Sequence, residues 1–211
     1  MNNRIVWVFR EERSGSTWFT SKLCHHLNRQ FYFFDGYQAH KNFKDREEYF
    51  LNRKQENEDY DRVLNTHNFF AMKSLGNYDN PVILRITRKD KVEQIISLYM
   101  TSMINLHNIH NNAELAKLPK LDKFIIPINK IEDYVNQFVS YEEHWQKYSL
   151  KYERVTVYYE NLLDSYSSPL LNISNWSMKN LNDSPTLKLP YDKKTLVLNY
   201  NQIELYIKKY L

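Results

Sequence analysis

Residues suited to binding an anion occur in two places in this sequence. The first is a segment that reads Glu12, Arg13, Ser14, Gly15, Ser16, Thr17 and Trp18. The arginine carries a fork of N–H donors that matches phosphate or sulfate oxygens, and the hydroxyls of Ser16 and Thr17 are further donors. Gly15, one of only three glycines in the chain, allows the backbone to approach a ligand closely. The segment therefore predicts an anion-binding loop; a tight turn with an ordinary helix cap is the alternative.

The second place begins at Arg88 and continues through Lys89, Asp90 and Lys91. Arg88 is expected at the carboxyl end of a strand, where ligands bind in open α/β sheets. Ser97 falls more than two turns into the helix that should follow, so it can reach the same ligand from the side. The pattern predicts a second anion site. A basic helix start with a solvent-facing serine is the alternative.

Both sites need elements that hold them in place. The apolar run Ile5 to Phe9 predicts a strand buried on both faces, and the spacing from Ser16 to Asn28 predicts a helix. A second clear strand is expected from Pro81 to Thr87, followed by a helix that Asp90 caps and that runs to about Leu106.

The rest of the chain continues the alternation of strands and helices. Strands are expected at 31–34, at 63–66 and at 155–159, helices at 131–148 and 201–211, a charged surface helix within 41–59, and a long loop or lid at 107–129. This order predicts one α/β domain over residues 1–211, with a central parallel sheet covered by helices on both faces.

The composition limits the classes of protein to consider. With 211 residues, 42% hydrophobic and 26% charged, the chain can build a packed core. A net charge of +4 suits a small anionic ligand and is too low to favour nucleic acid. The single Cys24 excludes an intramolecular disulfide and a cysteine-rich zinc site. No secretory or membrane-spanning segment is apparent, so we expect a cytoplasmic protein with no membrane partner. Its Asn-, Lys-, Ile- and Tyr-rich composition is typical of an AT-rich microbial or viral genome, and for a virus the compartment is the host cytoplasm.

The first loop resembles the 5′-phosphosulfate loop of sulfotransferases that use 3′-phosphoadenosine 5′-phosphosulfate (PAPS). That loop commonly reads Lys or Arg, a small residue, Gly, then two Ser or Thr, often followed by Trp. It differs from a Walker A loop, which needs an earlier Gly and a Lys after the last one. The resemblance implies a three-layer α/β/α fold of the P-loop-nucleotide-kinase-like sulfotransferase type. It also implies that Arg13 contacts the 5′-phosphate region and that Trp18 lies near the adenine, unless Trp18 is a core aromatic.

The second segment is similar to the 3′-phosphate site of the same family, where an Arg at a strand end is followed by a Ser eight or nine residues later. Arg-Lys-Asp-Lys, then Gln94 and Ser97, is especially similar to the bacterial trehalose-type branch. The resemblance implies that Arg88 and Ser97 hold the 3′-phosphate of PAPS and of its product, 3′-phosphoadenosine 5′-phosphate (PAP).

The same resemblance suggests a general base. In cytosolic members a Lys-Thr-His segment ends a strand, and here Asn65, Thr66 and His67 precede Arg88 by the family's spacing, with Asn65 replacing the Lys. A histidine accepts a proton readily near neutral pH. The trehalose-type branch uses instead a carboxylate that follows the first helix, which here would be Asp35; an ordinary turn residue is the other interpretation of Asp35.

A third similarity lies at Tyr158 to Leu162, which resembles the family's Tyr-Glu-Asp-Leu segment and implies that Tyr159 contacts the adenine or packs in the core. The family's C-terminal Arg-Lys-Gly loop is missing. Lys193 and Lys194 are either its substitute or a solvated pair.

The resemblance implies an enzyme that transfers a sulfuryl group from PAPS to a hydroxyl of a small-molecule or glycan acceptor, with no metal required. Sugar hydroxyls, phenols and tyrosyl peptides all remain open as acceptors. Two other functions are considered: a P-loop-type nucleotide or small-molecule kinase, which needs a Lys after the loop glycine and acidic Mg²⁺ ligands, and a basic nucleic-acid-binding module, which needs clustered Lys and Arg with aromatic residues between them.

Overall fold

The computed structural model describes residues 5–28, 30–33, 62–67, 69–77, 80–105, 112–177 and 190–211. The candidate base Asp35 and the expected surface helix within 41–59 lie outside the described residues.

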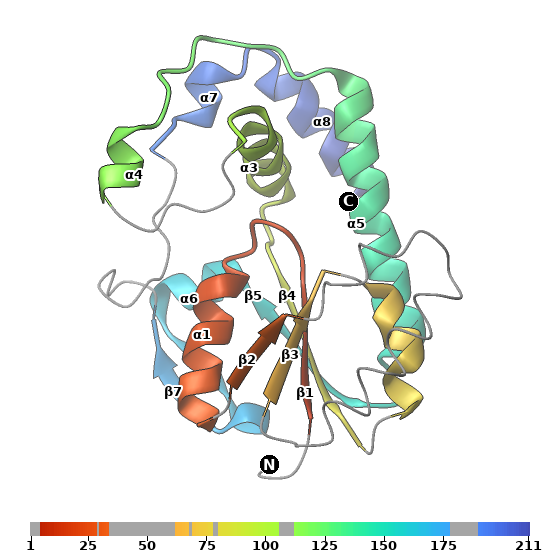
Figure 1. The fold of residues 1–211 in the computed structure, drawn as a ribbon. Helices are drawn as coiled ribbons and strands as arrows, with labels where there is room; N and C mark the ends of the chain where they lie inside the picture. Colours follow the sequence, from red (N-terminus) through yellow and green to blue (C-terminus); the bar gives the residue numbers. More distant parts are fainter. Residues whose placement is uncertain are drawn as a thin grey trace.

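A five-stranded parallel sheet forms the centre of the protein (Figure 1). Its strands are β1 (Val6–Arg10), β2 (Gln30–Phe33), β3 (Arg62–Thr66), β4 (Val82–Thr87) and β5 (Glu153–Tyr158), in the order β2-β3-β1-β4-β5. After β3 the chain crosses to the other side of β1 to form β4. Such a reversal is a topological switch point, where ligands bind beyond the carboxyl ends of the strands in open α/β sheets. Because Phe9 pairs with Thr66 and Arg10 with Ile86, the segments that follow β1, β3 and β4 meet at one edge.

The alternation of side chains along each strand builds one core on each face of the sheet. Val6 and Val8 of β1 face α1 (Ser16–Leu27), α6 (Tyr159–Asp164) and a small hairpin of β6 (Tyr166–Ser168) and β7 (Ile173–Trp176), which η3 (Pro169–Leu171) connects. Trp7 and Phe9 face η2 (Phe69–Asn77) and the second half of α5 (Ile128–Tyr148). Cys24, on the sheet side of α1, is 6% exposed. Both faces are therefore covered, as the apolar runs predicted.

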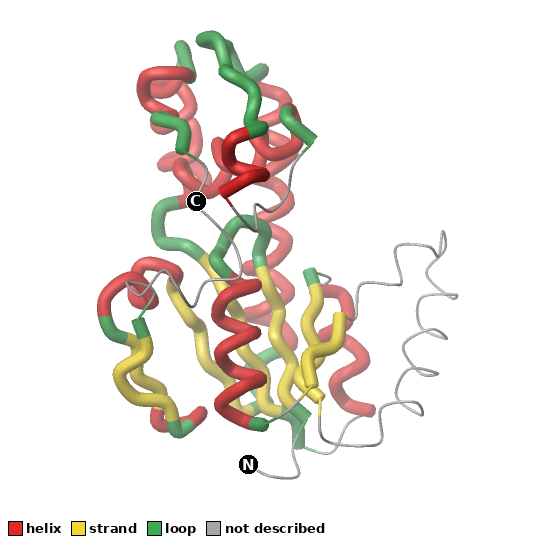
Figure 2. The backbone as a smooth tube through the Cα atoms, turned by 60° about the vertical axis from the view of Figure 1, so that its left-hand side comes forward, coloured by secondary structure: helices red, strands yellow, loops and turns green. Residues whose placement is uncertain are grey.

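A third core lies beyond the carboxyl edge of the sheet. It joins α3 (Lys91–Met103), the first half of α5 and α8 (Tyr200–Tyr210). Figures 1 and 2 show these helices, with the short α7 (Lys193–Leu196) and α4 (Asn112–Ala116), as a helical cap above the strand ends. The 21-residue α5 runs through both parts and packs its second half on the sheet. The edge where ligands are expected thus lies between the sheet and the cap.

The segment expected to be a long loop or lid is tied to the C-terminal part of the chain. Phe124 exchanges backbone hydrogen bonds with Leu196 and Leu198, of 3.0 and 2.9 Å. The Asn199 side chain accepts from Ile126 N at 3.1 Å and donates to Ile126 O at 2.9 Å. Residues 124–126 are therefore an integral part of the cap. None of the helices that the structure describes is long and apolar enough to cross a membrane.

Candidate anion-binding site

The loop between β1 and α1 has the backbone geometry of an anion site. Arg13 and Gly15 adopt left-handed conformations, with φ of 58° and 72°, and the Ser14 hydroxyl donates to Glu11 O at 2.6 Å. Gly15 is the N-cap of α1, and no side chain caps this helix among the described residues. The N–H groups of its first turn, together with the positive end of the helix dipole, therefore favour a bound anion.

Tyr159 explains why a glycine is needed in this loop. A Cβ added at Gly15 would lie 2.6 Å from Tyr159 Cδ2, which is far too close. The positive φ of Gly15 is also costly for residues with a side chain. The ring of Tyr159, at the start of α6, therefore packs directly against the loop backbone.

At this loop Arg13 meets Arg88 and Ser97, which lie 75 and 84 positions later in the sequence. Arg13 Nε donates to Ser97 Oγ at 3.3 Å, and Arg88 Nη1 lies 3.5 Å from Arg13 O. The Arg88 guanidinium stacks 4.2 Å from the centre of the Tyr159 ring. Burial and the nearby positive charge of Arg88 lower the pKa of Arg13. The structure thus brings the two expected anion sites together, with two like charges side by side.

One donor of Arg88 is left unsatisfied. Its Nε is buried and has no hydrogen-bond partner among the described residues. A buried donor without a partner costs about 1–3 kcal/mol. This donor therefore fits a ligand oxygen better than it fits the protein alone.

Glu11 is a functional candidate that the sequence interpretation missed. Its carboxylate is fully buried, with an exposed fraction of 0%. It accepts hydrogen bonds from Arg85 Nη2 at 2.6 Å, Thr87 Oγ1 at 2.7 Å and Lys91 Nζ. Gln94 Nε2 also contacts it at 3.3 Å and donates to Glu12 O at 2.7 Å. Glu11 therefore fastens the loop to β4 and α3.

The basic residues near the end of β4 differ in their partners: Arg85 and Lys91 bind Glu11, whereas Arg88 and Lys89 have other contacts. Burial lowers the pKa of Lys91, although the charge of Glu11 opposes this shift. For Arg85 burial acts in the same direction, but Glu11 and Glu142 outweigh it and the pKa is raised. Arg85 also forms an ion pair with Glu142, and the amine of Lys89 donates to Asn161 Oδ1 at 3.2 Å. Arg88 differs from these residues, because its guanidinium contacts Arg13 O and stacks on the ring of Tyr159.

The start of α3 differs from the start of α1, because carboxylates already occupy its donors. Glu160 accepts from Lys89 N at 2.9 Å and from Asp90 N at 3.2 Å. Asp90 accepts from Glu93 N at 2.9 Å, which confirms the expected cap. The helix end suited to an added anion is therefore that of α1.

The remaining loop residues have less access to a ligand. Ser14 and Ser16 are buried and Thr17 is half-buried. Trp18 is only 1% exposed and belongs to the core between α1 and the sheet. Its burial favours the core aromatic over a contact with adenine. Asn65, where cytosolic members have Lys, is also buried and donates to Thr20 Oγ1 at 2.8 Å.

His67 lies at the same edge, on the opposite side of the loop from Arg88. Its Nδ1 is 3.2 Å from Arg10 O and 3.9 Å from Glu12 Oε1. The contacts of His67 with the loop are therefore on the side of α5, whereas those of Arg88 and Ser97 are on the side of α3.

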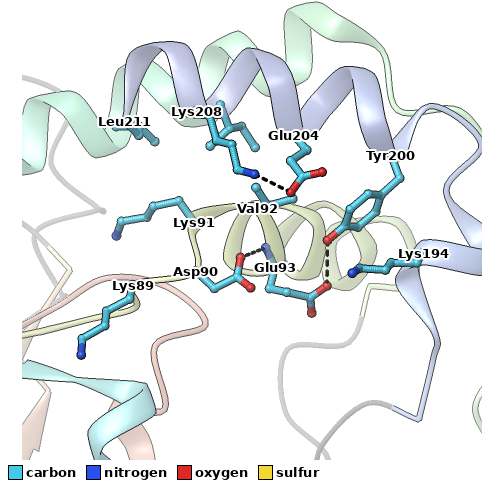
Figure 3. Close-up of a pocket in the computed structure, with 11 residues that line it drawn as sticks. Lys89, Asp90, Lys91, Val92, Glu93, Lys194, Tyr200, Glu204, Lys208 and Leu211 are labelled. Atoms are coloured by element: carbon cyan, nitrogen blue, oxygen red, sulfur yellow. Dashed lines mark hydrogen bonds and ion pairs between the residues drawn. The ribbon is translucent and has the colours of Figure 1, made fainter.

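A groove of about 780 Å³ separates the start of α3 from α8. Figure 3 shows Lys194 and Tyr200 on one side of it and Asp90 and Glu93 on the other. Burial raises the pKa of Tyr200 to about 12, and Lys193 forms an ion pair with Glu93. Lys193 is therefore paired with this carboxylate, whereas Lys194 is exposed.

Comparisons with family models, with curated proteins and with solved structures found no match. Within the described ranges, no cluster of three or more His, Cys, Asp or Glu side chains could hold a metal ion.

Proposed function

We propose that this chain is a PAPS-dependent sulfotransferase with the P-loop-nucleotide-kinase-like sulfotransferase fold. The observation that carries the proposal is the meeting of Arg13, Arg88 and Ser97 at the uncapped start of α1. Two guanidinium groups, a hydroxyl and a helix end suit a ligand with two separate anionic groups. PAPS has such a pair in its 5′-phosphosulfate and its 3′-phosphate.

Each group has a distinct role in the proposed site. The N–H groups at the start of α1 and the Arg13 guanidinium bind the 5′-phosphosulfate and stabilise the charge that develops on the departing phosphate. Arg88, through its unsatisfied Nε, and Ser97 bind the 3′-phosphate. Tyr159 holds the Arg88 guanidinium by stacking on it.

The acceptor reacts from the side of His67. The acceptor's oxygen attacks sulfur, the bond from sulfur to the 5′-phosphate oxygen breaks, and the proton of the acceptor passes to the base. His67 contacts the same loop as Arg13 does, one residue further toward β1.

Thermal unfolding of the purified chain with three ligands tests the proposal. PAP without Mg²⁺ should raise the melting temperature, because a ligand at one hundred times its Kd adds about 2.7 kcal/mol of stability. ATP with Mg²⁺ and a mixed-sequence oligonucleotide are the comparison ligands. Stabilisation by ATP with Mg²⁺ and not by PAP would establish the kinase alternative, and stabilisation by the oligonucleotide alone would establish the nucleic-acid-binding one.

The identity of the base is tested once a panel of glycans and phenols with labelled PAPS has given an acceptor. His67→Ala should lower turnover by about 10²–10⁴-fold and leave PAP affinity nearly unchanged. Asp35→Asn is the matched variant, since it keeps the size of the side chain and removes its basic group. Near-normal turnover in His67→Ala with an inactive Asp35→Asn would assign the base to Asp35.

A further inference from the structure

A second polar cluster lies on the opposite side of the loop from Arg88. Glu12 and Arg13 are neighbours in sequence, yet Glu12 contacts α5 while Arg13 contacts Ser97 of α3. Glu12 Oε1 is 3.9 Å from His67 Nδ1, and the two side chains are 23% and 24% exposed. Both are therefore largely shielded from water while remaining accessible from the edge of the sheet.

The carboxylate of Glu12 is fixed by two residues of α5, one helical turn apart. Gln137 Nε2 donates to Oε1 at 3.0 Å, and the Tyr141 hydroxyl donates to Oε1 at 3.1 Å. Burial raises the pKa of Glu12, although these hydrogen bonds and one from its own backbone oppose the rise. Gln94 holds the backbone of Glu12 from the other side, at 2.7 Å. The carboxyl group of Glu12 is thus held at a defined position.

The ring of His67 is oriented by the backbone at the end of β1. A carbonyl oxygen only accepts hydrogen bonds, so the contact with Arg10 O places a proton on Nδ1 and makes Nε2 the basic nitrogen of the neutral ring. Phe69, two residues later, stacks on Tyr141 with ring centres 4.4 Å apart. Tyr141 therefore contacts Glu12 through its hydroxyl and the segment of His67 through its ring.

We propose that Glu12 is a positioning residue for His67, and that its negative charge stabilises the imidazolium formed when Nε2 accepts a proton. The separation of 3.9 Å is too long for a hydrogen bond, so Glu12 acts through its charge.

This inference rests on the proposed function, in which the proton comes from the acceptor hydroxyl. In that step the acceptor O–H bond breaks and an O–S bond forms. The S–O bond to the 5′-phosphate also breaks, its electron pair leaves with PAP, and the proton stays on His67.

The proposal is tested by NMR titration of the His67 ring, which requires no acceptor and no turnover. Among the described residues, the titratable groups that the contacts place near the ring are Glu12, from the loop after β1, and Tyr141 of α5, which binds Glu12, with Arg85 of β4 against Phe69; Arg10 contributes its backbone carbonyl. Glu12→Gln should lower the pH midpoint of the ring by about one unit, because it removes a nearby opposite charge. Glu143→Gln is the matched control on an exposed carboxylate of α5 and should leave the midpoint unchanged.

Two further measurements separate a positioning role from a structural one. Glu12→Gln should bind PAP at least as tightly as the parent, whereas a tenfold loss would show that Glu12 only shapes the loop and would overturn the proposal. An unchanged midpoint in Glu12→Gln would overturn it as well. If this variant does not fold, the Glu12 carboxyl resonance of the parent is followed instead. This resonance must show an inflection at the pH where His67 titrates, because interacting groups titrate together. If no inflection occurs at that pH, Glu12 and His67 do not interact and the proposal is overturned.

The titration and the ligand assay test the two proposals independently. If PAP does not bind the parent while the midpoint shifts as expected, the pair stands and the sulfotransferase proposal fails. If PAP binds and the midpoint is unmoved, the sulfotransferase proposal stands and Glu12 has no such role.

Discussion

Arg88 differs from its basic neighbours in what its side chain faces, and this gives the first prediction at the scale of single residues. Arg88→Ala should weaken PAP binding by about 2 kcal/mol or more in calorimetry, since a charge-assisted contact with a phosphate is lost. Binding of adenosine 5′-phosphosulfate, which has no 3′-phosphate, should change much less. Lys89→Ala, which removes an exposed amine that contacts Asn161, is the control. Equal losses for the two ligands would refute the assignment of Arg88 to the 3′-phosphate.

Gly15 gives a second prediction at this scale. Gly15→Ala should lower the free energy of unfolding by about 2 kcal/mol or more, because its φ of 72° disfavours a side chain and the new Cβ meets Tyr159. Urea denaturation measures the loss. In a Tyr159→Ala background the same change should cost less, because only the backbone strain remains. An equal cost in both backgrounds would mean that the contact with Tyr159 does not matter.

The residues of the site were predictable from sequence to different degrees. Arg13, Arg88 and Ser97 stood out because a guanidinium or hydroxyl beside a strand end or on a helix suggests a ligand on its own. Glu11 gave no such signal, since its partners Arg85 and Gln94 lie 74 and 83 positions later in the chain. A carboxylate next to an arginine also looks like an ordinary surface residue until burial is known. For Trp18 the sequence left a ligand contact and a core position open, and its burial in the core favours the second.

At the scale of elements, Glu160 of α6 joins this helix to the turn between β4 and α3. Burial raises its pKa, but the N–H groups of Lys89 and Asp90 and the charge of Arg88 outweigh burial and lower it below its ordinary value of 4.5. A lowered pKa in the folded state means that the charged form contributes stability above pH 4.5, and that this contribution is lost as the pH falls through the lowered value.

Glu160→Gln should therefore be less stable than the parent at pH 7, by no more than about 1 kcal/mol since the group is partly exposed. The difference should shrink as the pH falls below 4.5. Denaturant unfolding across pH 3 to 7 measures it, with Glu143→Gln as the control. A difference that stays constant over this range would exclude the linkage.

The elements themselves were mostly predictable. The strands β1 and β4 and the helices α1 and α5 follow from long apolar runs or strong helical spacing, and each begins or ends within three residues of the expected position. The hairpin of β6 and β7 was missed because its strands are only three and four residues long and too polar to show a pattern. The helical cap was missed as a unit, since nothing in the separate helical patterns shows that α3, α5 and α8 share a core.

At the scale of the whole molecule, α5 connects the sheet to the cap. Val135 packs in the cap core, whereas Trp145 packs against the sheet. Asn136→Pro places a helix breaker between the two, where it removes a helical hydrogen bond and clashes with the preceding turn. The substitution should cost about 3 kcal/mol or more in urea denaturation. It should also reduce the slope of the unfolding free energy against urea concentration, because the sheet and the cap then unfold separately.

Asn129→Pro is the matched control, because proline is tolerated in the first turn of a helix. It lies on the same helix, is exposed in the same way, and should cost far less. If both variants lose the same stability and still unfold in one cooperative step, α5 is not the element that couples the two parts.

The reactivity of Cys24 can report how often the core between α1 and the sheet opens. This residue is the only cysteine of the chain, it is 6% exposed, and it lies on α1, the helix that begins directly after the candidate anion-binding loop. A thiol reagent can modify it only after α1 has moved away from the sheet, so the rate of labelling reports how often this face opens. A ligand that binds at the start of α1 must slow that rate in proportion to its occupancy. The protein thus contains its own kinetic reporter of binding, and no label has to be introduced to use it.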